Sequence, residues 1–415
     1  MHKIERPIIF SSSSSQVSNR FLGLVSQSCA VAYNMKRSVL KCPPELLLRQ
    51  VSTKHCGQQR LGNELYLRSP PSTSILAGKI CSSSAFQRRH FKAAFCTELG
   101  KPLSLGLKES SELCSGEVRI QVAAVGINFS DLLMVKGEYQ VKLSPPFTPG
   151  GEMSGTILEV ADDVHNFKPG MKVLGLCSAY GAFAEEVVTT CNAIWEMPSS
   201  MSFKEAAGFV CSYGTAMMGL SRRANLQHKE NVLVTAAAGA AGLAAVDIAS
   251  NVFGCNVFGA AGSDEKCSLV KSYGAKETIN YRNESLRDKM KKICPQGANV
   301  IFDAVGGSAF KDSLRSIAWE GRLIVVGFAS GEIPQIPANH LLVKNVSAVG
   351  LFWGAYSMAN LDVFRWSVDE CLKHYIKGQL KPHVCATYGF SKINQAFQFI
   401  QSRKSTGKVV VEIRD

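Results

Sequence analysis

The sequence lacks any long apolar run. The longest candidate is an Ala- and Gly-rich stretch from Val232 to Val246, which Asp247 closes, and a membrane-spanning helix needs about 20 apolar residues. We therefore expect a soluble chain with no membrane span. Charge is also sparse, at 19% of 415 residues against 46% hydrophobic residues, which excludes a disordered or fibrous protein. Because a single core rarely grows past about 250 to 300 residues, two domains are expected.

The cysteines also lack any regular spacing along the sequence. The chain has 14 cysteines, but no CxxC pair occurs among them. Their scattered spacing does not suggest a disulfide framework or a zinc site. Reduced, buried thiols are the expected state, and no bound metal is predicted.

Acidic residues are scarce at one end of the chain only. Residues 1–90 hold 13 Lys and Arg, three Asp and Glu, and 16 Ser, whereas residues 91–415 hold 33 basic and 30 acidic residues. A basic, Ser-rich and acid-poor extension is typical of an organellar transit segment, which favours a mitochondrial location. A tail on a cytoplasmic protein is the alternative. The near-neutral remainder argues against binding to nucleic acid, whose affinity grows with the number of phosphates neutralised.

Residues 91–213 read as short strands separated by Gly and Pro turns, a spacing that favours an antiparallel, barrel-like unit. The predicted strands are Val118 to Val125, Gly155 to Val160, Lys172 to Leu176 and Ala182 to Thr189.

Residues 214–347 change to an alternation of strand and helix, which predicts a parallel sheet with helices on both faces. The predicted strands are Val232 to Thr235, Asn256 to Ala260, Asn299 to Phe302 and Arg322 to Val326. The predicted helices are Ser263 to Tyr273, Glu284 to Ile293 and Ala309 to Ala318.

Residues 348–415 return to a different pattern. Helices are predicted over Leu361 to Lys377 and Ser391 to Arg403, and strands over Val384 to Tyr388 and Lys408 to Ile413. The fold class is therefore α/β, with a doubly wound parallel sheet inserted into a β-rich unit.

A loop of small residues follows the first strand of the alternating segment and opens a helix. Backbone N–H groups can approach a diphosphate closely in such a loop, and the helix N-terminus adds partial positive charge. The common G-x-G-x-x-G pattern has its first Gly where this chain has Ala, so the match is to a variant. Close packing of helix on sheet also produces such loops. The predicted diphosphate-binding residues are Ala237, Ala238, Gly239, Ala240, Ala241 and Gly242.

The end of the next strand indicates which dinucleotide binds. An acid there would bind the ribose 2′-OH of NAD, but residues 259–263 contain no carboxylate. Ser263, Lys266 and Tyr281 offer hydroxyls and a positive charge to a 2′-phosphate. NADPH is therefore predicted over NADH, unless Asp264 or Glu265 turns inwards.

Taken as a set, these motifs resemble the medium-chain dehydrogenase/reductase superfamily, and within it the zinc-free quinone oxidoreductases of the zeta-crystallin type. The resemblance runs from about residue 91 to residue 415. It rests on the small-residue loop together with the segments 126–131 (GINFSD), 149–152 (PGGE) and 303–307 (DAVGG). It implies a GroES-like catalytic domain formed by residues 91–213 and 348–415 around a Rossmann domain of residues 214–347. Thr215, Val305, Gly306 and Gly327 are further positions at which the resemblance implies cofactor contacts.

Zinc-dependent members of the superfamily carry Cys, His and Cys where this chain has Asn128, Gly151 and Ala207. None of these can replace a thiolate or imidazole ligand of Zn²⁺, so a zinc-free site is expected. The resemblance places Asn128 beside the nicotinamide and Asp131 in an orienting role. Tyr139 lies where related enoyl-thioester reductases carry a proton-donating Tyr. Capping of a helix by Asn128 and packing of the Tyr139 ring are the structural alternatives.

The sequence thus predicts an NADPH-dependent, zinc-independent oxidoreductase that transfers hydride to a quinone or activated enone. An enoyl-thioester reductase with Tyr139 as proton donor is an alternative. An alternative of another class is an NADPH-binding protein without turnover, acting as a sensor, structural protein or RNA binder. A homodimer is expected, in which residues 346–351 extend the sheet into a second copy.

Two departures from the family pattern concern the small-residue loop and its helix. Ala240 and Asp247 stand where Gly and Gln are usual. A buried Asp247 would need hydrogen-bond partners.

Overall fold

The computed structural model describes residues 89–414. The predicted basic extension therefore lies outside the described residues, apart from Arg89 and His90, and so does the segment on which a mitochondrial location would depend. Within residues 89–414, no helix combines the length and the apolar character that crossing a membrane requires.

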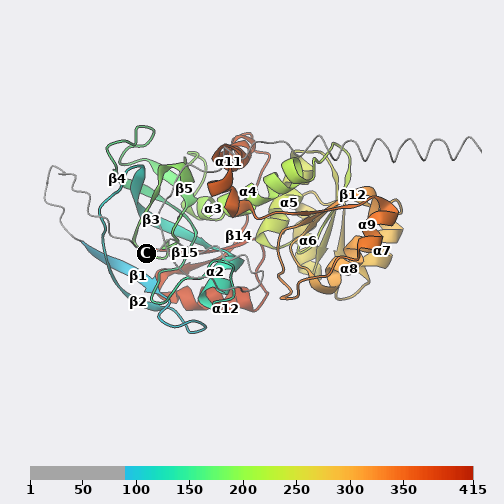
Figure 1. The fold of residues 1–415 in the computed structure, drawn as a ribbon, viewed down its shortest axis with the longest axis horizontal. Helices are drawn as coiled ribbons and strands as arrows, with labels where there is room; N and C mark the ends of the chain where they lie inside the picture. Colours follow the sequence, from blue (N-terminus) through green and yellow to red (C-terminus); the bar gives the residue numbers. More distant parts are fainter. Residues whose placement is uncertain (1–88, 415) are drawn as a thin grey trace, which may run out of the picture. The chain divides into compact units, whose positions relative to one another are not determined.

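A six-stranded parallel sheet forms from the alternating half of the sequence (Figure 1). Its strands are β8 (Asn231–Val234), β9 (Asn256–Ala261), β10 (Glu277–Asn280), β11 (Ala298–Asp303), β12 (Ile317–Val325) and β13 (Ser347–Gly350). Their spatial order is β10-β9-β8-β11-β12-β13, and every neighbouring pair is parallel. This is the order of a Rossmann sheet, whose direction of winding reverses between β8 and β11.

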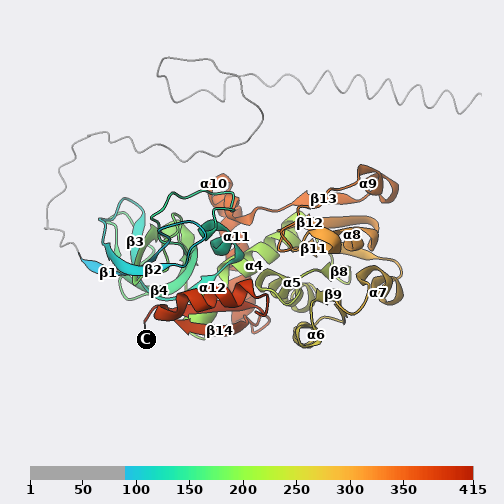
Figure 2. The same ribbon diagram turned by 90° about the horizontal axis from the view of Figure 1, so that it is seen from below.

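Helices cover both faces of this sheet (Figure 2). In β8, Val232 and Val234 join a core with α5 (Ala240–Asn251) and α6 (Asp264–Ser272). Leu233 points the other way, into a core with α7 (Leu286–Ile293) and α8 (Gly307–Arg315). Successive side chains of the strand thus point to opposite faces of the sheet, and both faces are buried, as a doubly wound sheet requires.

The second large sheet has seven strands and is mainly antiparallel. Its strands are β3 (Glu117–Ile127), β4 (Glu152–Val160), β5 (Lys172–Leu176), β6 (Glu186–Thr190), β7 (Ile194–Glu196), β14 (Val384–Gly389) and β15 (Lys408–Glu412). The order is β14-β15-β3-β4-β5-β7, with β6 paired to β3, and only β14 and β15 are parallel. Strands from both ends of the described chain therefore share one sheet. The separate hairpin pair is β1 (His90–Phe95) and β2 (Ser104–Glu109).

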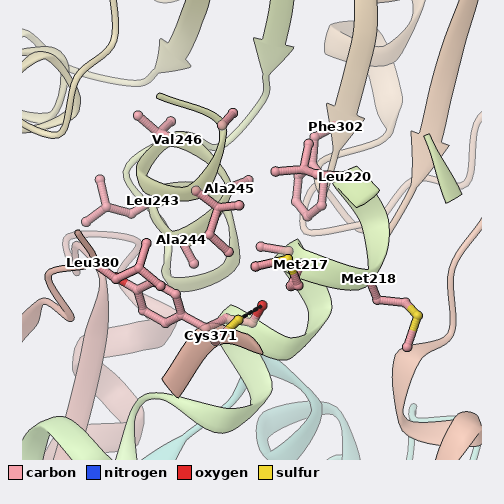
Figure 3. Packing of buried hydrophobic residues seen from close by; sticks show 14 of the residues in the cluster. Met217, Met218, Leu220, Leu243, Ala244, Ala245, Val246, Phe302, Cys371 and Leu380 are labelled. Carbon is pink, nitrogen blue, oxygen red and sulfur yellow. Dashed lines mark hydrogen bonds between the residues drawn. The ribbon is translucent and has the colours of Figure 1, made fainter. Parts of the chain in front are cut away.

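The remaining helices connect or cover these sheets. They are α2 (Phe129–Val135), α3 (Phe203–Ala207), α4 (Val210–Met217), α9 (Ala338–Lys344), α10 (Tyr356–Ala359), α11 (Leu361–Ile376) and α12 (Ile393–Gln401), with a π-helical turn at Met218–Arg223. Figure 3 shows α4 and α5 packed in one buried cluster. Ala244 and Ala245 are almost fully buried there, and their small side chains allow close approach of the two helices.

The predicted elements agree with the structure except at several ends. The clearest error concerns Ile317 and Ala318, which were assigned to a helix and instead begin β12, because α8 ends at Arg315. Their side chains are buried against the sheet, so tertiary packing overrides their helix-compatible pattern. The strand predicted from Ala182 begins only at Glu186. The structure contains the helix that Asn128 was given as capping in the structural alternative, because Asn128 is the N-cap of α2. Elements β1, β2, β7, β10, α3, α4, α9 and α10 were not predicted.

The predicted segment boundary after residue 347 falls inside an element. β13 extends to Gly350 and pairs with β12, so the parallel sheet includes three residues assigned to the C-terminal segment. β13 is an edge strand of the sheet. Its pairing with a second copy of the chain stays a prediction.

Candidate cofactor and hydride-transfer site

The small-residue loop lies at the carboxyl end of β8, where the sheet reverses its winding. Residues 235–238 form the turn, Gly239 is the N-cap, and α5 begins at Ala240. Leu243 is the first residue of this region that donates back into the helix, to the Gly239 carbonyl at 2.7 Å. The earlier N–H groups of the helix have no partner within it. They suit a diphosphate, because both hydrogen-bond donors and partial positive charge collect at this end.

Steric limits explain why this loop needs small residues. Ala236 has a φ of +46°, and a Cβ added to Gly242 would lie 2.2 Å from its carbonyl oxygen. No side chain fits in that gap without a backbone shift. Ala237 is fixed to the sheet, because its N–H donates to the Ala260 carbonyl of β9 at 2.9 Å. The loop is therefore shaped by backbone contacts, and its residues fit the role of a dinucleotide cradle.

A buried carboxylate organises the neighbouring loop at the end of β11. Asp303 accepts hydrogen bonds from the Thr235 hydroxyl at 2.7 Å and from the Gly306 N–H at 3.0 Å. Burial raises its pKa, and these two donors oppose the rise. The bonds fix the turn that contains Val305 and Gly306, and the Ser330 N–H donates to the Val305 carbonyl at 2.9 Å. Gly327 lies close by, since a Cβ there would be 3.7 Å from the Ala304 oxygen.

The end of β9 carries the residues predicted to select the ribose phosphate. Ser263 is the N-cap of α6, and its hydroxyl accepts from the Lys266 N–H at 3.3 Å. The Tyr281 hydroxyl lies near Gly262, 2.9 Å from where a Cβ would be. The Lys266 ammonium donates to the Arg403 carbonyl at 2.7 Å. Burial lowers the pKa of Lys266, and the positive charge of Arg282 lowers it further.

The two acids that weakened the NADPH prediction have partners of their own. Asp264 accepts from the Asn280 side-chain amide at 2.7 Å. A hydrogen bond from Ser263 lowers the pKa of Glu265. Both acids are exposed. Arg282, which sequence reasoning missed, adds positive charge around Lys266, and positive charge here suits a phosphate dianion.

Asn128 belongs to a polar cluster that the sequence did not reveal. Its side-chain Nδ2 donates to Glu152 Oε2 at 3.0 Å, and its Oδ1 accepts from Lys408 Nζ at 2.7 Å. Lys408 Nζ also lies 2.7 Å from Glu152 Oε2. The Cys211 backbone N–H, in the first turn of α4, donates to Glu152 Oε1 at 2.9 Å. The Glu152 carboxylate of β4 is thus contacted by Lys408 of β15, by Cys211 of α4 and by Asn128, the residue before α2.

Asp131 supports the backbone of Asn128. Asp131 Oδ2 accepts from the Asn128 N–H at 2.7 Å, while Oδ1 is buried and has no hydrogen bond among the described residues. Burial raises the pKa of Asp131 to about 6, opposed by the Asn128 N–H and the positive charge of Lys408. The negative charge of Glu152 adds to the rise. Asp131 therefore orients α2 from inside the protein.

Two tyrosines lie near this cluster. Burial raises the pKa of Tyr139, and its neighbours Cys211 and Asp131 add to the rise. Burial also raises the pKa of Tyr180, with Tyr139 among the further causes. Neither hydroxyl forms a hydrogen bond within residues 89–414. Both phenols therefore remain protonated at neutral pH and can donate to a ligand.

Tyr180 occupies space beside a position where zinc-dependent relatives carry a ligand. Its ring atoms lie 3.4 Å from the point where a Cβ on Gly151 would be, and its φ is +62°. Sequence reasoning missed Tyr180. The signal was present, because Gly151 leaves room for a large neighbour.

Thr215 and Asp247 lie on the two helices α4 and α5. Thr215 lies on α4, one turn beyond Cys211, and is partly buried. Asp247 is fully buried and accepts three hydrogen bonds: from the Tyr213 hydroxyl at 2.7 Å, from the Asn251 amide at 2.8 Å and from the Lys381 N–H at 2.8 Å. The partners required for a buried Asp247 are therefore all supplied.

The residues present do not fit a catalytic zinc ion. Asn128, Gly151 and Ala207 provide no thiolate or imidazole, and residues 89–414 contain no group of three His, Cys, Asp or Glu side chains arranged to hold a metal. Asn128 and Glu152 are instead engaged with Lys408.

Comparisons with known proteins agree with this architecture. Residues 114–217 match the family described as alcohol dehydrogenase GroES-like domain, and residues 240–369 match the zinc-binding dehydrogenase family. The chain is 47% identical over 380 residues to the quinone oxidoreductase-like protein 2 homolog of Nematostella vectensis, covering 91% of this chain and 100% of that protein.

Solved structures show the same likeness. The quinone oxidoreductase of Thermus thermophilus, solved alone and with NADPH, is 33% identical with a TM-score of 0.68, over 78% of this chain and 100% of that one. The CurK enoyl reductase is 27% identical with a TM-score of 0.71, over 79% of this chain and 100% of that one.

Proposed function

The chain belongs to the medium-chain dehydrogenase/reductase superfamily of oxidoreductases, and we propose that it transfers hydride from NADPH to a quinone or activated enone without zinc. The observation that carries this proposal is that two neighbouring residues at the start of β15 contact both the small-residue loop and the Asn128 cluster. The Gly407 N–H donates to the Ala238 carbonyl of the small-residue loop at 2.7 Å. The next residue, Lys408, binds the Asn128 amide.

The cofactor assignment rests on charge and shape. Residues 238–242 would hold the diphosphate at the start of α5, and Ser263, Lys266 and Tyr281 would face the 2′-phosphate. When bound, NADPH supplies the hydride. The quinone oxidoreductase of Thermus thermophilus, which was solved in complex with NADPH, supports this choice over NADH.

The acceptor assignment rests on the donors around Asn128. Hydride addition to a quinone or enone leaves negative charge on an oxygen, which a hydrogen-bond donor stabilises. Asn128 has one amide N–H that no described residue accepts, and the phenols of Tyr139 and Tyr180 are protonated. Neutral donors of this kind stabilise a delocalised oxyanion, and zinc-alkoxide chemistry lacks its ligands here.

An enoyl-thioester reductase is the second candidate, favoured by the likeness to the CurK enoyl reductase and by the position of Tyr139. The test is stopped-flow oxidation of NADPH, and of NADH, by quinones, enones and enoyl thioesters. The variants are Tyr139→Phe and Tyr180→Phe, each of which removes one phenolic donor.

We expect Tyr139→Phe to slow quinone reduction only slightly, because the Asn128 amide and the Tyr180 phenol still donate to the quinone oxygen. A loss of about 100-fold or more confined to enoyl thioesters would establish the second candidate instead. Tight NADPH binding with no turnover of any acceptor would indicate a binding protein without catalysis.

A further inference from the structure

The orientation of the Asn128 amide is fixed by chemistry. An Asn side chain has two ends of nearly equal shape, one an acceptor and one a donor. Lys408 can only donate, so the atom 2.7 Å from its Nζ must be the amide oxygen. The carboxylate of Glu152 can only accept when ionised, so the atom 3.0 Å from its Oε2 must be the amide nitrogen. Reversing the amide would place donor against donor and acceptor against acceptor.

The Lys408–Glu152 pair is enclosed by protein. The side chain of Lys408 is 3% exposed and that of Glu152 is fully buried. The stem of Lys408 passes two glycines, since a Cβ on Gly126 would lie 2.8 Å from its Cε and a Cβ on Gly208 would lie 2.7 Å from its Cγ. Only glycine at both positions leaves room for the Lys408 side chain. The close walls hold its ammonium group in one place.

A stabilising role alone does not explain such a pair. Replacing a buried ion pair by uncharged groups of similar volume is often neutral or stabilising, because two charges must be removed from water. The exposed pair Lys204–Glu412 at 3.0 Å needs no such desolvation. The buried pair therefore has a cost that a purely structural contact would avoid.

We propose that Lys408 and Glu152 are positioning residues, which lock the Asn128 amide so that its second N–H is presented to the oxygen of the bound acceptor. This inference rests on the proposed function for its catalytic consequence, though not for the orientation itself. Because Gly407 is hydrogen-bonded to the small-residue loop, the segment of Gly407 and Lys408 also fixes the position of the Asn128 amide relative to the cofactor.

The experiment compares Lys408→Met, Glu152→Gln and the double variant, with Lys204→Met as a control of matched chemistry at the surface. Each single change leaves one charge buried without its partner, so thermal unfolding is measured for all four. The double variant restores neutrality. Its new glutamine side chain carries both a donor and an acceptor, so it accommodates either orientation of Asn128.

We expect the double variant to recover stability and to bind NADPH with the wild-type Kd, yet to turn over about 100-fold more slowly, as misplaced reacting groups do. Lys204→Met should match wild type throughout. Recovery of wild-type turnover in the folded double variant would overturn the proposal.

A second measurement needs no activity. In ligand-free protein labelled with ¹⁵N-asparagine, the Asn128 side-chain signals are assigned by their loss in Asn128→Ser. We expect the amide proton donated to Glu152 to be shifted downfield and protected from exchange in wild type, and both effects to be lost in the double variant, where neither partner fixes the orientation. Unchanged signals in the double variant would overturn the lock. If wild type shows the signals but reduces none of the acceptors with NADPH, the proposed function fails while the orientation stands.

Discussion

Gly407 and Lys408 are neighbours on the chain, but they belong to regions of the site built in different ways. Gly407 bonds to the small-residue loop, whose shape comes from backbone contacts such as those of Ala236 and Gly242. Lys408 bonds to a cluster made of side chains from β15, β4 and the start of α2. The first region depends on the absence of side chains, and the second on their charges.

The two regions therefore differ in how they tolerate change. A backbone cradle fails when atoms are added, because there is no space for them. A buried polar cluster fails when a partner is removed, because the remaining group stays desolvated. Three predictions test this difference, beginning with the largest effect.

Gly242→Val should nearly abolish NADPH binding. Because even a Cβ would lie 2.2 Å from the Ala236 oxygen, the loop must move away from its diphosphate-binding shape. We expect Kd to rise about 1000-fold, equivalent to about 4 kcal/mol, measured by nicotinamide fluorescence. Gly354→Ala, which meets only an ordinary contact at 3.7 Å, is the control. Wild-type affinity in a folded Gly242→Val protein would refute the steric account.

Asp131→Asn should change the pH dependence of stability. The pKa of Asp131 is about 6 in the folded protein, above its unfolded value, so protonation favours the folded state. This contribution is fully present below about pH 4 and is lost as the pH rises to 6 and beyond. Wild type should lose about 2.5 kcal/mol relative to Asp131→Asn between pH 4 and pH 7, measured by urea unfolding. Parallel pH profiles of the two proteins would contradict this expectation.

Lys266→Ala should weaken NADPH binding about tenfold, or about 1.4 kcal/mol, and leave NADH binding unchanged. The reason is that only NADPH carries the phosphate that Lys266 would face. Lys271→Ala, which removes an exposed charge from the same helix, separates a local contact from a general field effect. An equal loss for both cofactors in Lys266→Ala would show that Lys266 supports the Arg403 loop instead.

The sequence was most informative where function depends on local pattern. The loop from Ala237 to Gly242, its position between strand and helix, and the missing acid after β9 are all visible within about 30 residues. The Asn128 cluster was not visible, because Lys408 is separated by 256 positions from Glu152, its partner in the 149–152 motif. Tyr180 was missed for a similar reason, since its contact with Gly151 depends on a turn. The misassigned Ile317 shows the same limit for fold, because burial against β11 decides its conformation.

The Asp247 carboxylate has a consequence for how this chain can diverge. It receives donors from α4, from its own helix α5 and from the segment before β14. An amide at this position would bring two N–H groups of its own, and at least one would face a donor already in place. A substitution at 247 is therefore expected to need a compensating change at 213, or a reversed side-chain amide at 251.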